Sequence, residues 1–286
     1  MIQPTIAKRE VTKYILKTFD IHMSKKLGQN FLIDEAIVQE IVHAADIQEG
    51  ETVLEVGPGI GTLTQGLAEA KANVVAVELD NRLPEVLAKT LEGYDNVRIV
   101  HGDILKVNIP ELVEGKNFKV VANLPYYITT PIIMALLEQK LPVTKIVTMI
   151  QKEVADRMVA KPGKKDYGAL SVAVQYYTTP EIVAQVPPKS FIPAPAVDSV
   201  VIRCDVRPEP AVKVISEKMF FRVVKAAFSQ RRKTLSNSLK TMGIAAEEIK
   251  KAIDEAAIDG TRRGETLTLQ EFAVIADNLE KNKIDA

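Results

Sequence analysis

The stretch Val53-Leu54-Glu55-Val56-Gly57-Pro58-Gly59-Ile60-Gly61-Thr62-Leu63-Thr64 decides how this chain folds. It begins as an apolar, β-branched run, which predicts a buried strand. Glycines at three alternate positions, Gly57, Gly59 and Gly61, then break the run, and helical spacing follows over 62–70. A strand, a tight glycine turn and a helix form the first half of a nucleotide-binding βαβ unit. Glycine suits such a turn because it allows φ > 0 and leaves room for a ligand where a Cβ would otherwise stand.

The spacing of the glycines narrows the choice of ligand. The dinucleotide fingerprint G-x-G-x-x-G would place its third glycine at position 62, where this chain has Thr62. Glu78 ends the next apolar run, close to the ~20-residue offset at which a carboxylate accepts both ribose hydroxyls. E-x-G-x-G-x-G followed by that acid resembles the S-adenosylmethionine (SAM) site of Rossmann-like methyltransferases. The glycines alone would suit any Rossmann-type turn equally well, so the rest of the chain has to decide.

The composition excludes several classes of protein. With 286 residues, 47% of them hydrophobic and 26% charged, the chain has room for one large α/β domain and a smaller one. No apolar run approaches the ~18 residues of a transmembrane helix and the first residues lack a signal-peptide core, so we expect a cytoplasmic protein. Cys204 is the only cysteine, which excludes an intramolecular disulfide and a cysteine-based zinc site. His22 and His43 show no partner arrangement, so we assign no metal.

Basic residues are distributed unevenly, although the net charge is zero. From Arg203 to Lys240, ten basic side chains stand against three acidic ones, a net charge of +7. Two further clusters are Lys161, Lys164 and Lys165, and the arm residues Lys8, Arg9, Lys13, Lys17, Lys25 and Lys26. Basic patches on a neutral protein indicate a localised phosphate-binding face. For any one patch, a solvated helix surface is the alternative.

Apolar runs alternate with helical patterns along most of the chain. They predict strands at 52–56, 74–78, 97–101, 118–122 and 145–150, and a later pair at 181–186 and 199–205. This alternation predicts a mainly parallel sheet with right-handed crossovers. Helical patterns are expected within 1–24, from Glu35 to Ala45 with Asp34 as N-cap, and near 213–228, 231–241, 247–257 and 268–279. We therefore expect an α/β domain over 1–209 and, after a proline-rich linker, a small all-helical domain over 210–286.

Polar residues follow the strands at the edge where such sheets bind ligands. Asp103 follows the third strand, where its carboxylate would accept from the exocyclic amine of an adenine or would cap a short turn. Asn123-Leu124-Pro125-Tyr126 follows the fourth strand, and its alternative reading is a turn with a proline stop and a buried tyrosine. The proline-rich loop from Pro187 to Ser199 cannot pair within a central sheet, but it would hold Phe191 in place.

Together these residues resemble the ribosomal RNA adenine dimethyltransferase family, in the branch that modifies small-subunit (16S) rRNA. The matching motifs are Leu27-Gly28-Gln29-Asn30-Phe31-Leu32, Glu55-Val56-Gly57-Pro58-Gly59-Ile60-Gly61, Glu78-Leu79-Asp80, Gly102-Asp103, Asn123-Leu124-Pro125-Tyr126, Phe191 with Pro193, Pro195, Val197 and Ser199, Gln230-Arg231-Arg232-Lys233-Thr234-Leu235 and Arg262-Arg263-Gly264-Glu265-Thr266-Leu267. They run in the family's order from about residue 25 to about residue 275. Ala196 and the pair Leu83-Pro84 depart from the family's usual pattern.

The resemblance implies a Rossmann-like SAM-dependent methyltransferase sheet whose cofactor is S-adenosyl-L-methionine. The residues that it implies for cofactor binding are Asn30 and Leu32 in a lid, Gly57 and Gly59 in the turn, Glu78 at the ribose, Asp103 at the adenine amine, and Asn123. At the target base, the Asn123 oxygen and the Leu124 carbonyl would accept the hydrogens of the amine, while Pro125 stiffens the turn. Tyr126 and Phe191 would stack on the extruded adenine. Arg231, Arg232 and Lys233 would bind RNA phosphates.

The expected activity is dimethylation of the N6 amine of two adjacent adenosines in the 3′-terminal hairpin loop of 16S rRNA. The partner is then the small ribosomal subunit, with a role in ribosome biogenesis, and the enzyme is expected to be a monomer. One alternative is an Erm-type enzyme that methylates 23S rRNA. Others are a ribosome-assembly factor whose main role is binding, and an NAD(P)-dependent oxidoreductase, which the missing third glycine disfavours.

Overall fold

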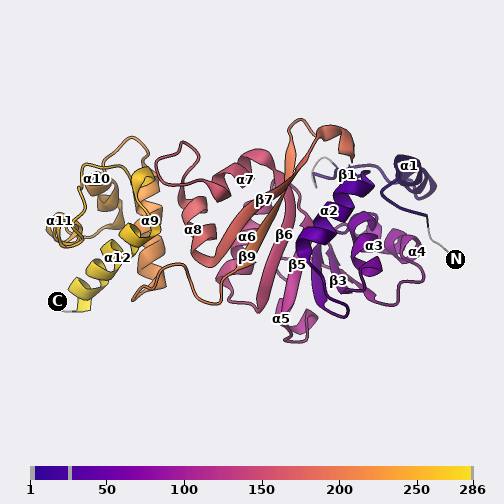
Figure 1. Cartoon of the computed structure of the whole chain (residues 1–286), viewed down its shortest axis with the longest axis horizontal. Helices are drawn as coiled ribbons and strands as arrows, with labels where there is room; N and C mark the ends of the chain where they lie inside the picture. Colours follow the sequence, from indigo (N-terminus) through magenta and orange to yellow (C-terminus); the bar gives the residue numbers. More distant parts are fainter. Residues whose placement is uncertain (1–3, 25–27, 285–286) are drawn as a thin grey trace. The chain divides into compact units, whose positions relative to one another are not determined.

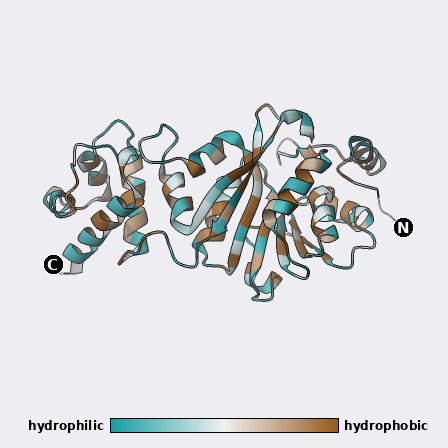
Figure 2. Cartoon of the chain, viewed as in Figure 1, coloured by the Kyte–Doolittle hydropathy of each residue, from teal (hydrophilic) through white to brown (hydrophobic). Residues whose placement is uncertain are grey.

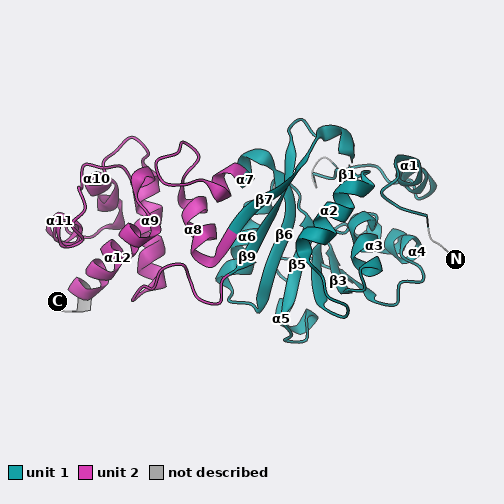
Figure 3. Cartoon of the chain, in the orientation of Figure 1, with its two compact units in different colours: residues 1–155, 180–206 teal, residues 156–179, 207–286 magenta. Residues whose placement is uncertain are grey.

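The structure is a computed structural model that describes residues 4–24 and 28–284, so Lys25, Lys26 and Leu27 of the expected arm and lid lie outside the described residues. The chain forms two compact units (Figure 3). Unit 1 comprises Met1–Ala155 and Pro180–Val206, and unit 2 comprises Asp156–Thr179 and Arg207–Ala286. The boundary expected at 209/210 lies close to the second of these junctions. The segment 156–179, which the sequence pattern had assigned to the first domain, belongs to unit 2.

Unit 1 is built on a seven-stranded sheet, which Figure 1 shows in this part of the chain. Its strands are β2 (Thr52–Val56), β3 (Asn73–Glu78), β4 (Val97–His101), β5 (Phe118–Asn123), β6 (Val143–Gln151), β7 (Thr178–Val186) and β9 (Ser199–Val206), in the order β4-β3-β2-β5-β6-β9-β7. The neighbours from β4 to β6 are parallel, and β9 runs antiparallel to β6. The expected strands and the mainly parallel sheet are confirmed.

Helices pack against this sheet because its central strands are largely buried and carry many hydrophobic residues (brown in Figure 2). The helices of unit 1 are α1 (Arg9–Thr18), α2 (Glu35–Ala45), α3 (Thr62–Glu69), α4 (Leu83–Thr90), α5 (Ile109–Leu112) and α6 (Thr129–Glu138), and α7 (Lys152–Val159) begins in unit 1 and ends in unit 2. Asp34 stands at the N-cap of α2, as expected, but its side chain does not cap the helix. Its carboxylate instead accepts a hydrogen bond of 2.7 Å from the Ser190 hydroxyl, which joins α2 to the proline-rich loop.

A small second sheet was not expected from the sequence. Strand β1 (Phe31–Leu32) pairs antiparallel with β8 (Phe191–Ile192), so that Leu32 lies opposite Phe191. Two residues are too few to produce a periodic pattern, and the partners lie far apart in the chain. The pairing fixes the expected lid beside the proline-rich loop.

Unit 2 is helical around its own apolar core. Its helices are α8 (Ala169–Tyr177), α9 (Glu217–Ser229), α10 (Leu235–Leu239), α11 (Ala246–Glu255) and α12 (Leu269–Ile284). Tyr176 of α8 stacks on Phe220 of α9 with ring centroids 4.9 Å apart, which explains why 156–179 packs here. The helix expected over 231–241 begins only at Leu235, because 230–233 form a turn closed by the Lys233 N–H and the Gln230 carbonyl (2.9 Å).

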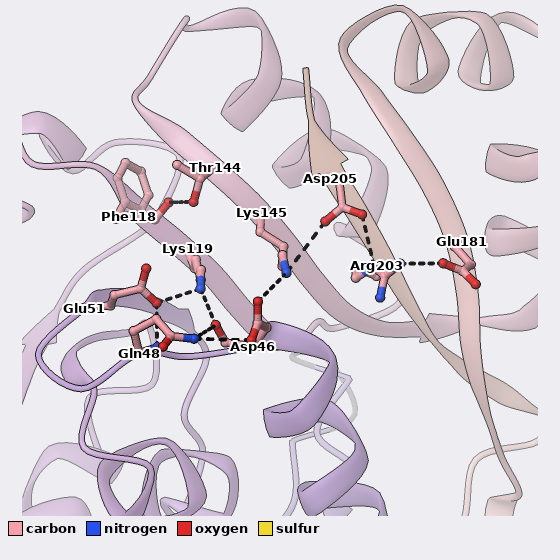
Figure 4. A network of polar contacts seen from close by, with 10 residues as sticks. All are labelled: Asp46, Gln48, Glu51, Phe118, Lys119, Thr144, Lys145, Glu181, Arg203 and Asp205. Carbon is pink, nitrogen blue, oxygen red and sulfur yellow. Dashed lines mark hydrogen bonds and ion pairs between the residues drawn. The ribbon is translucent and has the colours of Figure 1, made fainter. Parts of the chain in front are cut away.

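A chain of polar contacts in unit 1 crosses the sheet at β5 and β6 (Figure 4). The buried ammonium of Lys119 contacts Glu51 Oε2 at 2.6 Å and donates to the Asp46 carbonyl at 2.5 Å. Lys145 lies 3.7 Å from Asp46 and 3.8 Å from Asp205. These contacts fasten the end of α2 and the start of β2 to the central strands, at the edge remote from the strand ends that carry the glycine turn.

No helix among residues 4–24 and 28–284 is both long enough and apolar enough to cross a membrane.

Candidate active site

A cavity opens at the carboxyl ends of β2, β3, β4 and β5. In open parallel sheets, ligands bind at this edge. Ten of the expected site residues line it: Asn30, Leu32, Gly57, Gly59, Glu78, Asp103, Asn123, Leu124, Pro125 and Tyr126. The parallel order of the strands therefore brings together motifs that are almost a hundred residues apart in the chain.

The glycine turn forms one wall of the cavity. Gly57 has φ +69° and Gly59 has φ +62°, values that favour glycine. A Cβ built on Gly57 would meet no atom within 4 Å, whereas one on Gly59 would stand 3.2 Å from the Phe31 ring. The space in front of Gly57 is therefore left open by the fold, as the approach of a ligand to the backbone requires.

Glu78 is buried at the end of β3 with both carboxylate oxygens held in place. Oε1 accepts from the Asp80 N–H at 2.7 Å, and Oε2 accepts from the Gly59 N–H at 3.1 Å. Burial raises the pKa of this carboxyl, and the two N–H donors partly oppose that rise. A carboxylate offers about four lone-pair sites, so two remain to accept hydroxyl groups of a ligand.

The carboxyl group of Asp103 caps a short turn, which is one of the two roles considered from the sequence, whereas binding of an adenine amine stays a prediction. Its Oδ1 accepts from the Leu105 N–H at 3.0 Å, which caps the turn after β4. Its Oδ2 lies 3.5 Å from the exposed Lys106 ammonium, and the side chain also lines the cavity. The turn thus fixes the direction of a carboxylate that keeps acceptor capacity for a donor in the cavity.

Glu55 is a buried acid that the sequence analysis assigned no role. It lies in β2 with 1% of its surface exposed, lines the cavity, and its Oε2 has no hydrogen-bond partner among the described residues. Burial raises the pKa of Glu55 to about 8, and the nearby Glu78 carboxylate adds to the rise. The sequence feature that could have identified Glu55 is an acidic residue inside an otherwise apolar strand.

The expected lid forms hydrogen bonds with a residue that follows β3 and with the last residue of β5. Gln29 donates to Asp80 Oδ2 at 2.8 Å, and Asn123 Nδ2 donates to the Asn30 carbonyl at 3.2 Å. Asp80 also forms an ion pair of 2.5 Å with Arg82, whose hydrogen bonds hold the pKa of Asp80 down at about 2. Gln29, Asp80 and Arg82 were not predicted as site residues, although two of them lie within the quoted motifs.

Residues 123–126 form a turn between β5 and α6. The Pro125 carbonyl accepts from the Ile128 N–H at 3.2 Å and from the Thr129 hydroxyl at 3.0 Å. The hydroxyl of Tyr126 lies 2.6 Å from Ser199 Oγ, which fixes the ring at the cavity wall. Among the described residues, the Asn123 side-chain oxygen and the Leu124 carbonyl accept no hydrogen bond.

Phe191 does not line the cavity. Only 2% of its surface is exposed, because β8 directs it into an apolar cluster that contains Leu32, Leu63 and Met149. The expected contact with a base stays a prediction, because the ring is buried in this cluster. Tyr127, which was not predicted, is 55% exposed at the cavity and would contact a Cβ on Gly28 at 3.4 Å.

The basic residues expected to bind RNA are exposed in unit 2. Arg231 donates to the Lys165 carbonyl and lies 3.8 Å from the Glu265 carboxylate. The Gly163 N–H donates to the Glu265 carbonyl at 2.8 Å, so the two basic clusters at 161–165 and 231–233 are neighbours. Glu265 partly compensates Arg231, whereas no ion pair among the described residues involves Arg232 or Lys233.

The hydrogen-bond acceptors of the cavity and the open space beside them suit a nucleoside with a further polar group. Glu78 keeps acceptors for two hydroxyls, Asp103 keeps an acceptor for an amine, and an open space faces Gly57. These are the groups that the adenosine part of SAM presents, so the residues present fit that cofactor. Among the described residues, no group of three or more His, Cys, Asp or Glu side chains is arranged to hold a metal ion.

Comparison with known proteins gives concordant matches. The family model described as ribosomal RNA adenine dimethylase matches residues 21–281. A protein of Alkaliphilus oremlandii named ribosomal RNA small subunit methyltransferase A is 51% identical over 282 residues, covering 96% of this chain and 98% of the relative. A protein of the same name from Clostridioides difficile is 51% identical over 286 residues, covering 98% and 99%.

Two solved structures resemble the chain over most of its length. A dimethyladenosine transferase from Plasmodium falciparum has a TM-score of 0.73 at 27% identity, covering 88% of this chain and 98% of the other. The 23S rRNA methyltransferase ErmE has a TM-score of 0.68 at 27% identity, covering 88% and 100%. The expectation of a methyltransferase-type α/β sheet with a helical C-terminal part is confirmed.

Proposed function

The chain belongs to the ribosomal RNA adenine dimethylase family, and from this premise we propose how its cavity holds cofactor and target. The protein is an rRNA adenine dimethyltransferase. The observation that carries the proposal is that Glu78, Asp103 and Asn123, at the ends of three different strands, line one cavity. The turn Asn123-Leu124-Pro125-Tyr126 offers two acceptors to an amine, a feature that hydride transfer by an oxidoreductase does not require.

SAM is the proposed cofactor. Bound SAM supplies an activated methyl group on a sulfonium centre. Glu78 would accept the ribose hydroxyls through the lone pairs that the Gly59 and Asp80 N–H groups leave available. Asp103 would accept from the adenine amine, Gly57 would let the backbone approach the methionine part, and Asn30 and Leu32 would cover the site, with Gly59 in the same turn; all of these residues line the cavity.

The chain's own residues then prepare the target amine. Its lone pair is conjugated into the adenine ring, so the amine is a poor nucleophile. The Asn123 oxygen and the Leu124 carbonyl, both available to accept, draw the two amine hydrogens and favour a tetrahedral nitrogen. Pro125 has no backbone N–H that could compete with the amine as a hydrogen-bond donor. Correct alignment of the amine and the methyl group lowers the activation free energy by up to ~7–11 kcal/mol.

Tyr126 is the proposed stacking partner of the target base. Its hydroxyl contact with Ser199 orients the ring at the cavity, and stacking is worth ~1–3 kcal/mol per base. That is comparable with the few kcal/mol needed to extrude a base. Stacking by Phe191 stays a prediction, which requires the ring to leave the apolar cluster in which it is buried.

The proposed substrate is small-subunit rRNA, at two adjacent adenosines of the 3′-terminal hairpin loop of 16S rRNA. Relatives named for the small subunit are about half identical to this chain, whereas the 23S rRNA enzyme ErmE is 27% identical. This difference makes the large-subunit alternative the weaker one. We further propose that the enzyme acts as a monomer in the cytoplasm, during ribosome biogenesis.

The test is incubation of the purified protein with SAM and either unmodified small subunits or large subunits, followed by mapping of methylated adenosines. We expect two neighbouring N6,N6-dimethyladenosines in the small subunit only. Modification of 23S rRNA would support the alternative. Calorimetric titration with SAM and, separately, with NAD identifies the cofactor, and heat from NAD alone would overturn the assignment.

A further inference from the structure

Helix α1 is a fixed part of unit 1. Its buried side and flanks pack into an apolar cluster with Phe31 and Ile60, one beside the lid and one in the glycine turn. The buried arm residues in this cluster are Ile6, Ile15 and Ile21. The Ile6 N–H also donates to Gln65 Oε1 at 2.8 Å. The outer face of α1 is therefore presented in a defined position next to elements of the cavity.

That outer face is strongly basic. Arg9, Lys13 and Lys17 are exposed and recur every four residues, which aligns them along one side of the helix. Lys8 at the N-cap adds a fourth positive charge. Glu10 is the single acid between Lys8 and Thr18, so the segment has four basic and one acidic side chain, a net charge of +3.

This pattern is unfavourable for an isolated helix surface. Like charges at i, i+4 repel, and positive charges at a helix N-terminus oppose the helix dipole. Lys250 of α11, in contrast, pairs with Asp254 at i, i+4. Among the described residues, no ion pair involves Arg9, Lys13 or Lys17. Solvent exposure alone does not explain why like charges are aligned without acidic partners. A bound polyanion would supply the missing negative charge.

Two neighbouring features indicate which polyanion fits. Tyr14 is 70% exposed on the same helix, and an exposed aromatic ring among cations is typical of surfaces that bind unpaired nucleic acid. Arg9 Nη2 donates to the Lys189 carbonyl at 3.5 Å, and the Lys189 side chain is exposed. Lys189 precedes β8, which pairs with the lid strand β1, so the basic row continues to the loop beside the lid.

We propose that α1 and Lys189 form a second RNA-binding surface, which binds an unpaired segment of the substrate rRNA. Arg9, Lys13, Lys17 and Lys189 contact phosphates, and Tyr14 stacks on a base. The surface lies in unit 1 and is independent of Arg231, Arg232 and Lys233 in unit 2. It rests on the proposed function for the identity of the RNA, and it adds a binding site to that function.

The test compares the triple variant R9Q/K13Q/K17Q with wild type and with a matched control. The control K71Q/K116Q/K250Q removes the same number of charges from exposed lysines that already have acidic partners. Binding of a single-stranded oligouridylate is measured across a salt series. Single-strand contacts contribute about −0.7 each to the log–log salt slope, so we expect the triple variant to flatten the slope by about two units. The control should retain the wild-type slope.

Stacking is tested separately, with Tyr14→Ala and Tyr14→Phe. Loss of one stacked base should weaken oligouridylate binding about fivefold or more in Tyr14→Ala, and Tyr14→Phe should restore it. Thermal unfolding and SAM titration verify that each variant is folded. Equal salt slopes for wild type and the triple variant would overturn the proposal. Binding to anionic phosphatidylglycerol vesicles is measured as well, and a triple variant that loses vesicle binding but keeps wild-type RNA binding would also overturn it.

The failure of this surface and the failure of the proposed function give different results. If the slopes are equal while wild type still methylates small subunits, only the α1 surface is wrong. If the slopes differ as expected but small subunits are not methylated, α1 binds RNA and the methylation assignment is wrong.

Discussion

At the residue scale, three acids of the site have different surroundings: Glu55 and Glu78 line the cavity, and Asp80 binds the lid residue Gln29. Asp80 is held by Arg82 and Gln29, and its pKa lies at about 2. Glu78 is held by two backbone N–H groups, and burial raises its pKa. Glu55 has an oxygen without a partner among the described residues, and burial raises its pKa to about 8. The pKa values of these acids are therefore shifted in opposite directions, upward by burial at Glu55 and Glu78 and downward by the hydrogen bonds of Arg82 at Asp80.

Glu55 should make the stability of the cofactor-free protein depend on pH. Its pKa is about 8 in the folded state against an ordinary value of 4.5, so between these pH values the folded protein binds a proton that the unfolded chain releases. The free energy of unfolding should therefore fall as pH rises through this window. Glu55→Gln cannot titrate, and its curve should be flatter. Urea denaturation at a series of pH values measures both, and parallel curves would contradict the assignment.

Substitutions at Phe191 distinguish a role in packing from a role in stacking on the target base. Because its ring is buried in the apolar cluster, Phe191→Ala should lower the free energy of unfolding by about 3–5 kcal/mol. Phe191→Leu retains most of the apolar volume and should retain most of the stability. Chemical denaturation is the measurement. A fully stable Phe191→Ala variant that has lost methyl transfer would instead place the ring at the target base.

At the element scale, the contacts of Lys119 hold the end of α2 and the start of β2 to β5 (Figure 4). Burial alone would raise the pKa of Glu51, but the Gln48 N–H and the Lys119 ammonium bring it below its usual value. The pair thus contributes stability above the ordinary pKa of Glu51, and that stability is lost as pH falls through the lowered pKa.

Lys119→Met should remove this contribution together with the hydrogen bond to the Asp46 carbonyl, which keeps only the 3.4 Å contact from Gln48 Nε2. We expect a loss of about 1–3 kcal/mol at neutral pH. The difference between wild type and variant should narrow in acid, where Glu51 becomes protonated, and the part due to the Asp46 carbonyl should remain. SAM affinity should be unchanged, because the pair lies away from the cavity-lining residues. The measurement is denaturation at neutral and acidic pH. An equal difference at both pH values would show that the ion pair is not the cause.

At the scale of the whole molecule, the sequence predicts what depends on local pattern. The apolar runs located the seven main strands, and parallel order made Gly57, Glu78, Asp103 and Asn123 converge. Packing between segments that are distant in the chain cannot be predicted from local patterns. The β1–β8 pairing, the attachment of α8 to unit 2 through Tyr176, and the burial of Phe191 all depend on partners distant in the chain. The contact of Arg231 with Glu265 likewise joins two motifs that the sequence presents separately.

Arg231, Arg232 and Lys233 test whether the basic face of unit 2 binds rRNA. Replacing all three with alanine should flatten the log–log salt slope of rRNA binding by about two to three units, or less if Glu265 already neutralises Arg231. SAM affinity should not change, because the cavity is lined by residues of unit 1. RNA binding across a salt series is the measurement. A slope equal to that of wild type would mean that these charges only solvate the turn.

The central claim is that the cavity positions a target amine between Asn123 and the cofactor. The most direct measurement is the single-turnover rate of methyl transfer by Asn123→Ala, with saturating SAM and unmodified small subunits. The Asn123 contact matters most while the nitrogen changes geometry, so we predict a large fall in this rate with nearly unchanged RNA affinity. A single-turnover rate equal to that of wild type, in a folded variant that binds SAM, would contradict the claim.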